Sequence, residues 1–169
     1  MRMATKPDPP NPPIDSPERR RLPLLMRRAW YGLNQAFRRR IAHLGVTPDQ
    51  FTVMRTLLEG DPKGMTQRQL AVAMSSDPNT VASLLERMEK AGLVERKEHE
   101  HDRRAHRIRL LPLSRKKYTE AREVAVALQT DILSALPAQE RERFLENLNT
   151  AADACRKAAE IDLRSPGAD

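Results

Sequence analysis

Amide, hydroxyl and guanidinium side chains gather between residues 67 and 104 of this 169-residue chain. An Asn or Gln amide and an Arg guanidinium can each form two hydrogen bonds with the edge of one base, and hydroxyl groups can reach bases or phosphates. The sequence holds no recognisable arrangement of nucleophile, base and orienting acid, and no Gly-rich phosphate loop, so catalysis has little support. The candidate residues are Gln67, Arg68, Asn79, Thr80, Ser83, Arg87, Arg103 and Arg104.

The composition favours a polyanionic partner. Thirty Lys and Arg residues against 23 Asp and Glu give a formal charge of +7, which attracts polyanions at long range. Aromatic residues make up only 4% of the chain, too few to build a stacking platform for single-stranded nucleic acid. Double-stranded DNA is therefore the favoured polyanion.

Several functional classes are disfavoured by what the sequence lacks. We expect no membrane partner, because no apolar run approaches spanning length and the N-terminus has no signal-peptide core. The single cysteine, Cys155, fits a reducing compartment, and we expect a cytoplasmic protein. His99 and His101, two residues apart beside Asp102, have poor spacing for zinc, so we expect no metal and no cofactor.

Two short helices are predicted around the central polar residues. Thr66 and Gln69 can form a capping box that starts the first helix, and Asp77 before Pro78 caps the second. Gly92 is expected to end the second helix in the left-handed conformation. Two short helices joined by a tight polar turn form the unit that places its second helix in a DNA major groove. The predicted inward residues of this helix are Val81, Leu84, Leu85 and Met88, which leaves Asn79, Thr80, Ser83 and Arg87 outside.

The stretch that follows predicts a hairpin with a charged tip. Residues 93–96 and 108–110 are short strand-like runs, and they flank a strongly charged loop over 97–104. Because this tip is so strongly charged, it is not expected to pack in a hydrophobic core. A projecting wing is the better interpretation. Arg103 and Arg104 suit a narrow minor groove, where negative potential is concentrated.

Long amphipathic helices are predicted at both ends of the chain. Apolar residues recur at three- and four-residue steps over about 16–44, and again in two helices after Pro112 and Pro137. Such narrow seams must pair with other helices, which favours a bundle between two chains. The predicted fold is mainly α with a small β-hairpin wing, an α+β winged helix in an intertwined helical homodimer. The expected regions are a disordered Pro-rich tail (1–15), an N-terminal dimerisation helix (16–46), a winged helix-turn-helix domain (47–111), C-terminal dimerisation helices (112–163) and a tail (164–169).

These blocks together resemble the MarR family of bacterial regulators over about residues 24–163. The most specific matches are residues 46–51, 65–71, 80–84, 87–96 and 102–105, in that order and spacing. The resemblance implies a homodimer, a second helix in the major groove and a wing in the minor groove. Its Asp-x-Arg wing motif falls on Asp102, which would support the wing, and Arg104, which would contact the groove. Residues 110–114 depart from the family pattern because the usual capping hydroxyl and Gly are missing, so we expect the next helix to begin differently.

Two further sites are weighed against simple packing. Relatives bind small aromatic effectors near the first long helix, and by this resemblance Trp30, Met54, Arg27 and Arg28 would line a pocket for an aromatic acid or its CoA thioester. The competing interpretation for Trp30 is packing in the dimer core. Cys155 lies on an apolar seam, which favours a packing thiol over a sensor.

The sequence thus predicts a sequence-specific regulator of transcription that binds double-stranded DNA at a pseudo-palindromic operator and acts as a repressor released by a small effector. Two alternatives stay open. The chain could be a winged-helix module that binds a protein partner, or a non-specific architectural DNA binder. For Asn79, Ser83 and Arg87, an ordinary solvated helix face also remains an alternative to base contact.

Overall fold

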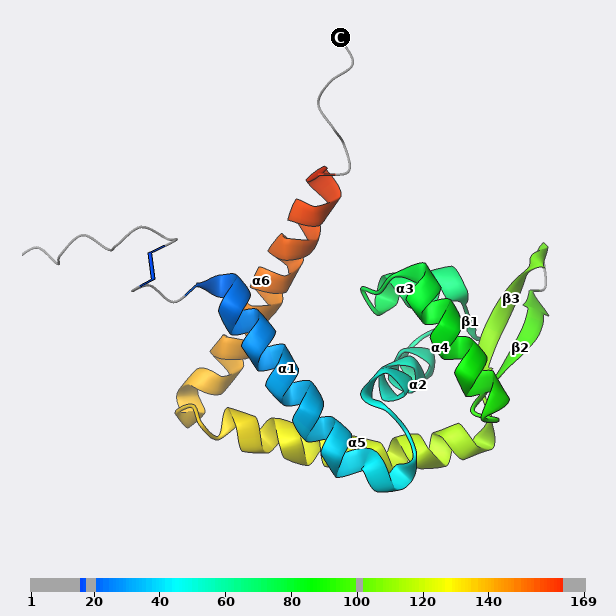
Figure 1. The fold of residues 1–169 in the computed structure, drawn as a ribbon, viewed down its shortest axis with the longest axis horizontal. Helices are drawn as coiled ribbons and strands as arrows, with labels where there is room; N and C mark the ends of the chain where they lie inside the picture. The colour runs from blue at the N-terminus through cyan, green and yellow to red at the C-terminus, as the bar shows by residue number, and fades with distance from the viewer. Residues whose placement is uncertain (1–15, 18–20, 100–101, 163–169) are drawn as a thin grey trace, which may run out of the picture. The chain divides into compact units, whose positions relative to one another are not determined.

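The computed structural model describes residues 16–17, 21–99 and 102–162, with the side chains of 99, 102–105 and 160–162 excepted. Figure 1 shows these residues as helices with one small sheet. The predicted fold class, mainly α with a small β wing, is confirmed. The elements in chain order are α1 (Leu22–Ile41), η1 (Ala42–Leu44), α2 (Pro48–Glu59), β1 (Met65–Thr66), α3 (Gln67–Ala73), α4 (Pro78–Lys90), β2 (Val94–His99), β3 (Asp102–Leu110), α5 (Pro112–Leu133), η2 (Ala138–Glu140) and α6 (Arg141–Asp162).

Internal contacts divide the chain into two units, with the boundary inside α5 between Val124 and Ala125. The first unit holds α1, the helix-turn-helix, the sheet and the start of α5. The second holds the rest of α5 together with η2 and α6. All the candidate residues of the binding surface therefore belong to the first unit.

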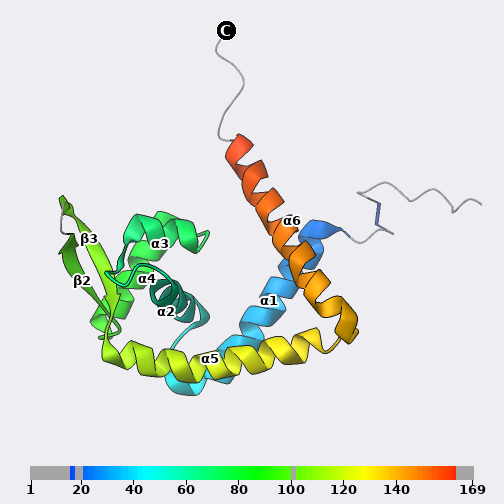
Figure 2. The same ribbon diagram turned by 180° about the vertical axis from the view of Figure 1, so that it is seen from behind.

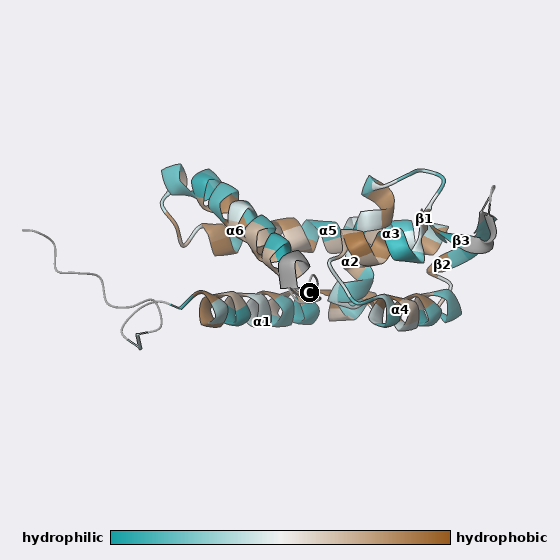
Figure 3. Ribbon diagram, turned by 90° about the horizontal axis from the view of Figure 1, so that it is seen from above, coloured by the Kyte–Doolittle hydropathy of each residue, from teal (hydrophilic) through white to brown (hydrophobic). Residues whose placement is uncertain are grey.

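The hydrophobic core of the first unit is centred on α2. Figure 3 colours much of α2 as hydrophobic, and its side chains Val53 and Met54 are fully buried. Burial of a large apolar side chain contributes about 1.5–3 kcal/mol, so this core fixes the helices around it. The residues that α3, α4, β2 and β3 bury in the same unit are Leu70, Ala71, Val81, Leu84, Leu85, Met88, Val94 and Ile108.

Local capping explains where the helices of this unit begin. Thr47 and Gln50 form a complete capping box at α2, and Thr66 and Gln69 form another at α3. In each box the Thr hydroxyl accepts from the third backbone amide, while the Gln side chain accepts from the Thr amide. The box predicted at α3 is therefore present, and α2 begins with a second one.

The sheet is larger than the sequence predicted. Its order is β1-β3-β2, all antiparallel, and β1 pairs Met65 with Ile108 at the edge of the longer hairpin. Figure 2 shows β2 and β3 as a hairpin beside α4. The two strands continue through much of the stretch expected as a loop, with Lys97 paired to Arg107. Backbone pairing does not require apolar side chains, so this charged stretch carries no hydrophobic signal of strand structure.

The start of α5 is held by a serine rather than by the usual cap. The helix begins at Pro112, and the side chain of Ser114 is fully buried in its first turn. Its hydroxyl donates a hydrogen bond to the carbonyl oxygen of Leu93, which also accepts from the Leu111 amide at 3.1 Å. The sequence predicted that this helix begins differently from the family pattern at residues 110–114. In the structure, these two hydrogen bonds join the start of α5 to Leu93, the residue before β2.

The first helix is shorter at its N-terminal end than predicted. Arg21 is extended and α1 begins at Leu22, whereas the sequence pattern suggested a start near Ser16. Figure 3 colours the first turn of α1 as hydrophobic, and Leu22, Leu24 and Leu25 are exposed there.

The terminal helices carry further exposed apolar side chains in the single chain. An exposed apolar stripe on a long helix calls for another helix to cover it, so dimerisation stays a prediction of these residues. Cys155 on α6 is also exposed in the single chain, and its burial depends on such a partner. The remaining exposed apolar residues of α1, α5 and α6 include Trp30, Tyr31, Leu33, Leu113, Val126, Ile132, Phe144 and Leu148.

Candidate nucleic-acid interface

Helix α4 begins at a well-formed cap. The Asp77 carboxylate accepts hydrogen bonds from the backbone amides of Asn79 at 2.9 Å and Thr80 at 3.0 Å, and Pro78 occupies the first turn. Asp77 thereby satisfies amide groups that have no partner inside the helix. At the other end Gly92 has φ +66°, as predicted for its left-handed position. The cap and the glycine define the ends of α4.

One face of α4 packs into the core, and the other carries polar side chains. Val81, Leu84, Leu85 and Met88 are buried. The four predicted contact residues Asn79, Thr80, Ser83 and Arg87 are all exposed. The Arg87 Nε donates to the Ser83 carbonyl oxygen at 3.2 Å, so the guanidinium is held beside Ser83 on the same surface.

Two charged residues on this exposed face were missed by the sequence reasoning. Lys90 Nζ lies 2.7 Å from the Glu86 carboxylate, and both side chains are exposed. The hydrogen bond from Lys90 and its positive charge lower the pKa of Glu86. The i,i+4 spacing of an acid and a base on one helix was the available signal. Glu86 therefore places a negative charge, largely offset by Lys90, on the surface that also holds Ser83.

The start of α3 lies against the start of α4. Gln67 is half-buried, and its Nε2 donates to the carbonyl oxygen of Pro78 at 3.5 Å. Arg68 beside it is exposed. The Gln67 amide thus joins the two helices of the helix-turn-helix, a role that the sequence reasoning did not assign to it.

Two arginines of β3 form hydrogen bonds with the loop after α2. Arg107 Nη1 donates to the Gly64 carbonyl oxygen at 2.7 Å and lies 3.4 Å from the Asp61 carboxylate. Arg109 Nε donates to the Lys63 carbonyl oxygen at 2.7 Å. Because these partners are 43 to 46 residues apart in the sequence, no local pattern could reveal them. These hydrogen bonds hold β3, and with it the β2–β3 hairpin, against the loop after α2.

The sheet is also joined to α4 by a salt bridge. Arg96 of β2 lies 3.2 Å from the Glu89 carboxylate of α4. A partly exposed ion pair of this kind contributes up to about 1 kcal/mol, but it also orients the hairpin relative to the helix.

The predicted wing residues open strand β3. Asp102 pairs with His99, and the register shifts between Glu98 and His99. The side chains of Asp102, Arg103 and Arg104 lie outside the described part of the chain, as do those of His99 and His101. The backbone therefore puts all three wing candidates at the far end of the hairpin from Leu110.

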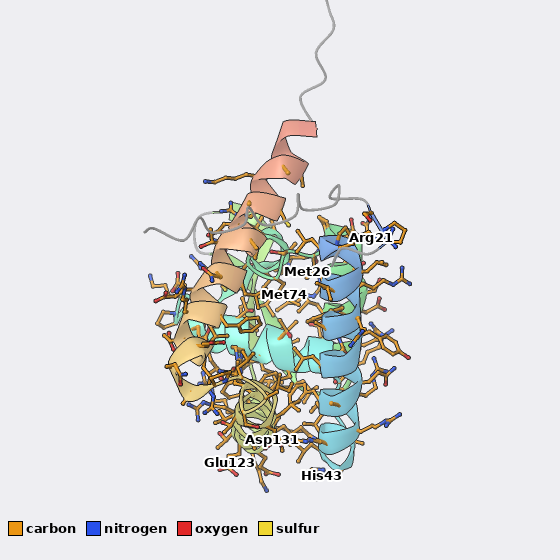
Figure 4. The ribbon with its side chains drawn as sticks, turned by 90° about the vertical axis from the view of Figure 1, so that its left-hand side faces the viewer. Arg21, Met26, His43, Met74, Glu123 and Asp131 are labelled. Carbon is orange, nitrogen blue, oxygen red and sulfur yellow. The ribbon has the colours of Figure 1, made fainter. Side chains whose placement is uncertain are left out.

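The four residues expected to line an effector pocket do not share a surface. Arg27, Arg28 and Trp30 are exposed on α1, whereas Met54 of α2 is fully buried in the core. Figure 4 draws side chains along α1, with Arg21 and His43 labelled near its two ends.

An aromatic cluster instead joins α1, α2 and α5. Phe37 meets Phe51 edge-on with ring centroids 5.0 Å apart, and Phe51 stacks on Tyr118 at 5.3 Å. The Arg55 guanidinium covers the Phe51 ring at 4.8 Å.

A capped second helix with a polar outer face, a preceding short helix and a strand hairpin joined to both define a winged helix-turn-helix protein. Among the described residues, every helix is too short or too polar to span a lipid bilayer.

Comparison with known proteins agrees with this class. Residues 44–105 match the model of the MarR family. The transcriptional regulator HosA of Escherichia coli O127:H6 is 30% identical over 127 residues, which cover 72% of this chain and 93% of HosA. The chain belongs to the MarR family of transcriptional regulators. The relatives it matches are regulators of transcription and not enzymes.

Two solved structures of similar proteins contain DNA. The Mycobacterium tuberculosis transcriptional regulator MosR, crystallised with DNA, is 27% identical, covers 80% of this chain and 98% of its own, and superposes with a TM-score of 0.65. The transcriptional repressor CouR, bound to a 23-mer DNA duplex, is 26% identical over 78% of this chain and 92% of its own, with a TM-score of 0.70. CouR from Rhodococcus jostii RHA1 has also been crystallised with p-coumaroyl-CoA.

Proposed function

We propose that this protein regulates transcription by binding double-stranded DNA sequence-specifically as a homodimer. The observation that carries the proposal is the polar face of α4, where Asn79, Thr80, Ser83 and Arg87 are exposed opposite a fully packed core face. A capped helix with such a face, held by the core behind it, fits the major groove of B-DNA.

Each candidate residue has a role that follows from its chemistry. Asn79 and Arg87 read adenine and guanine edges, and the hydroxyls of Thr80 and Ser83 bind bases or phosphates. Arg68 binds the phosphate backbone near the start of α3. The side-chain amide of Gln67 donates both to a phosphate and to the carbonyl oxygen of Pro78.

The wing adds a second set of contacts. Arg103 and Arg104 enter the minor groove, and Asp102 supports the hairpin that carries them. The net charge of +7 supports both contact sets by attracting the duplex.

Dimerisation would bring two such surfaces onto one duplex. The exposed apolar side chains of α1, α5 and α6 support a partner chain, because burying them removes a large apolar area from water. Two-fold symmetry then requires a pseudo-palindromic operator with half-sites about 10 bp apart.

The protein acts in the cytoplasm by binding and not by catalysis, as a repressor that a small effector releases. The effector belongs to the aromatic acids or their CoA thioesters, and the binding of p-coumaroyl-CoA by CouR, a repressor of the same fold, supports this class. Such a ligand releases DNA only if it binds the DNA-free conformation more tightly than the DNA-bound one.

A gel-shift titration with the upstream region of the protein's own gene tests DNA binding, with unrelated DNA as the comparison. Arg104→Ala should weaken binding and make the dependence of log K on log salt shallower, because one cation that releases counterions from the duplex is lost. The matched control is Arg122→Ala, which removes an exposed arginine from α5 instead of the wing.

The alternatives give different results in the same titration. Equal affinity for all sequences would indicate an architectural DNA binder. An unchanged affinity in Arg104→Ala, or no DNA binding by the parent protein, would favour a protein-interaction module.

A further inference from the structure

The outward face of α4 carries an acidic residue close to its centre. Successive residues of an α-helix are about 100° apart, so the buried stripe of α4 also fixes which residues lie opposite the core. Glu86 and Lys90 lie within about 30° of that opposite direction. Asn79 and Ser83 share this sector, whereas Arg87 lies about 70° to one side. Glu86 is therefore as central to the face as the residues already assigned to base contact.

The other acids at α4 have partners that hold them away from the centre of this face. Asp77 accepts from the first amides of the helix, and the Glu89 carboxylate lies 3.2 Å from Arg96 of β2. The Glu86 carboxylate instead lies 2.7 Å from the Lys90 ammonium, one turn further along the outward face. The exposed fractions are 61% for the Glu86 side chain and 74% for that of Lys90, so both groups remain accessible to a molecule lying on α4.

A carboxylate on this face limits what can lie against it. The hydrogen bond and the charge of Lys90 lower the pKa of Glu86, so at neutral pH the group is ionised and can only accept hydrogen bonds. Phosphate oxygens, base carbonyl oxygens and purine N7 atoms are acceptors too, and they cannot bind it. In the major groove its possible partners are the amines of cytosine and adenine. The Lys90 ammonium offsets the negative charge, so the pair does not prevent α4 from approaching DNA.

The Glu86–Lys90 pair matches the groups that a C·G base pair presents in the major groove. Cytosine presents its N4 amine, and guanine presents O6 and N7 as acceptors. The N4 amine and O6 are hydrogen-bonded to each other about 2.9 Å apart, close to the 2.7 Å between the Glu86 carboxylate and the Lys90 ammonium. An A·T pair has an amine and a carbonyl at similar spacing, but adenine N7 beside the amine repels a carboxylate and the thymine methyl crowds the carbonyl. C·G is therefore the better fit.

We propose that Glu86 is a specificity-determining residue, which accepts a hydrogen bond from the N4 amine of one cytosine in each half-site, while Lys90 donates to O6 or N7 of the paired guanine. A guanine or thymine at the cytosine position places a carbonyl oxygen opposite the carboxylate, and two acceptors repel each other. This inference rests on the proposed function, because Glu86 can read a base only when α4 lies in the major groove.

The test selects binding sites from random-sequence duplexes with the full-length parent protein and two variants, Glu86→Gln and Glu120→Gln, and then measures affinities by gel shift. Glu120 is exposed on α5, so the control removes the same charge and changes long-range attraction to DNA equally, but leaves α4 intact. At one position of each half-site, the parent and the control should prefer C·G over the other pairs by about tenfold. Glu86→Gln should lose this preference and keep those at other positions, because a Gln amide both donates and accepts. Thermal melting checks that both variants fold.

Three results would overturn the role of Glu86. They are a selected site without a C·G position, unchanged base preferences in Glu86→Gln, and a gain in affinity by the same factor for every sequence. The last result would show that the carboxylate only repels phosphates. Failure of the proposed function gives a different result, because the parent protein itself would then bind no DNA or all sequences equally, and this inference would fall with it. Sequence-specific binding that Glu86→Gln leaves unaltered would refute this inference alone.

Discussion

Replacing Gly64 by alanine tests how firmly the loop after α2 is held against the sheet. Gly64 has φ +96°, and a Cβ built there would lie 2.5 Å from the Ile108 carbonyl oxygen and 2.9 Å from the Arg109 side chain. Ile108 cannot retreat easily, because it pairs with Met65 of β1 on one side and with Arg96 of β2 on the other. The added methyl group therefore meets backbone that is fixed from both sides.

The cost of this substitution has two parts. The positive φ costs an alanine about 1–2 kcal/mol. Overpacking against fixed backbone costs about 1–3 kcal/mol more. We expect Gly64→Ala to lower the free energy of unfolding by about 3 kcal/mol in total.

Gly92→Ala is the matched control for the first part alone. Gly92 has φ +66°, but nothing lies within 4 Å of its added Cβ, so only the backbone strain of about 1 kcal/mol remains. Urea denaturation at one fixed protein concentration measures both variants, and an unchanged m-value confirms that the same surface is exposed on unfolding. Equal losses in the two variants would refute the reasoning, because they would show that the loop moves away from Ile108 at little cost.

Two further predictions concern the cap of α4 and the proposed dimer. Asp77→Ala should lower stability by about 1 kcal/mol, with a melting temperature about 3 °C lower, because the amides of Asn79 and Thr80 lose their acceptor. Asp77→Ser keeps an acceptor and should recover most of the loss, whereas equal melting of the two variants would contradict the capping role. Leu148→Glu should shift the protein toward a monomer in light-scattering chromatography, because it places a charge among the exposed apolar residues of α6. Asn149→Glu adds the same charge at an exposed polar position, and an equal shift in that control would argue against a specific apolar interface.

The features that could be predicted from sequence are those set by short-range geometry. Asp77 at the start of α4 and Gly92 after its end were identified because a cap and a left-handed glycine act within one helical turn. The buried face of the same helix followed from residue spacing alone. The same spacing predicted that Asn79, Ser83 and Arg87 lie on the exposed face of α4, as the structure shows.

The features that were missed depend on partners far away in the sequence. Strand β1 has only two residues, and it exists because β3 offers an edge for Met65 and Thr66 to pair with. The bonds of Arg107 and Arg109 to the loop after α2 likewise join segments more than forty residues apart. Neither kind of contact leaves a periodic pattern of apolar residues, which is what sequence reasoning detects.

The same distinction explains why the outward face of α4 was easier to predict than a ligand site. A single helix with one packed side determines which residues of α4 face outward, so its periodicity is sufficient information. The cavity of about 330 Å³ that Arg115 helps to line is built from α2, the loop that follows it, β2, β3 and α5. Met54 was assigned to an effector pocket by resemblance, and the packing shows what spacing did not, that its side chain is fully buried in the core of the single chain. Residue type alone therefore identifies a surface made by one element, but a site made by five segments requires their packing to be known.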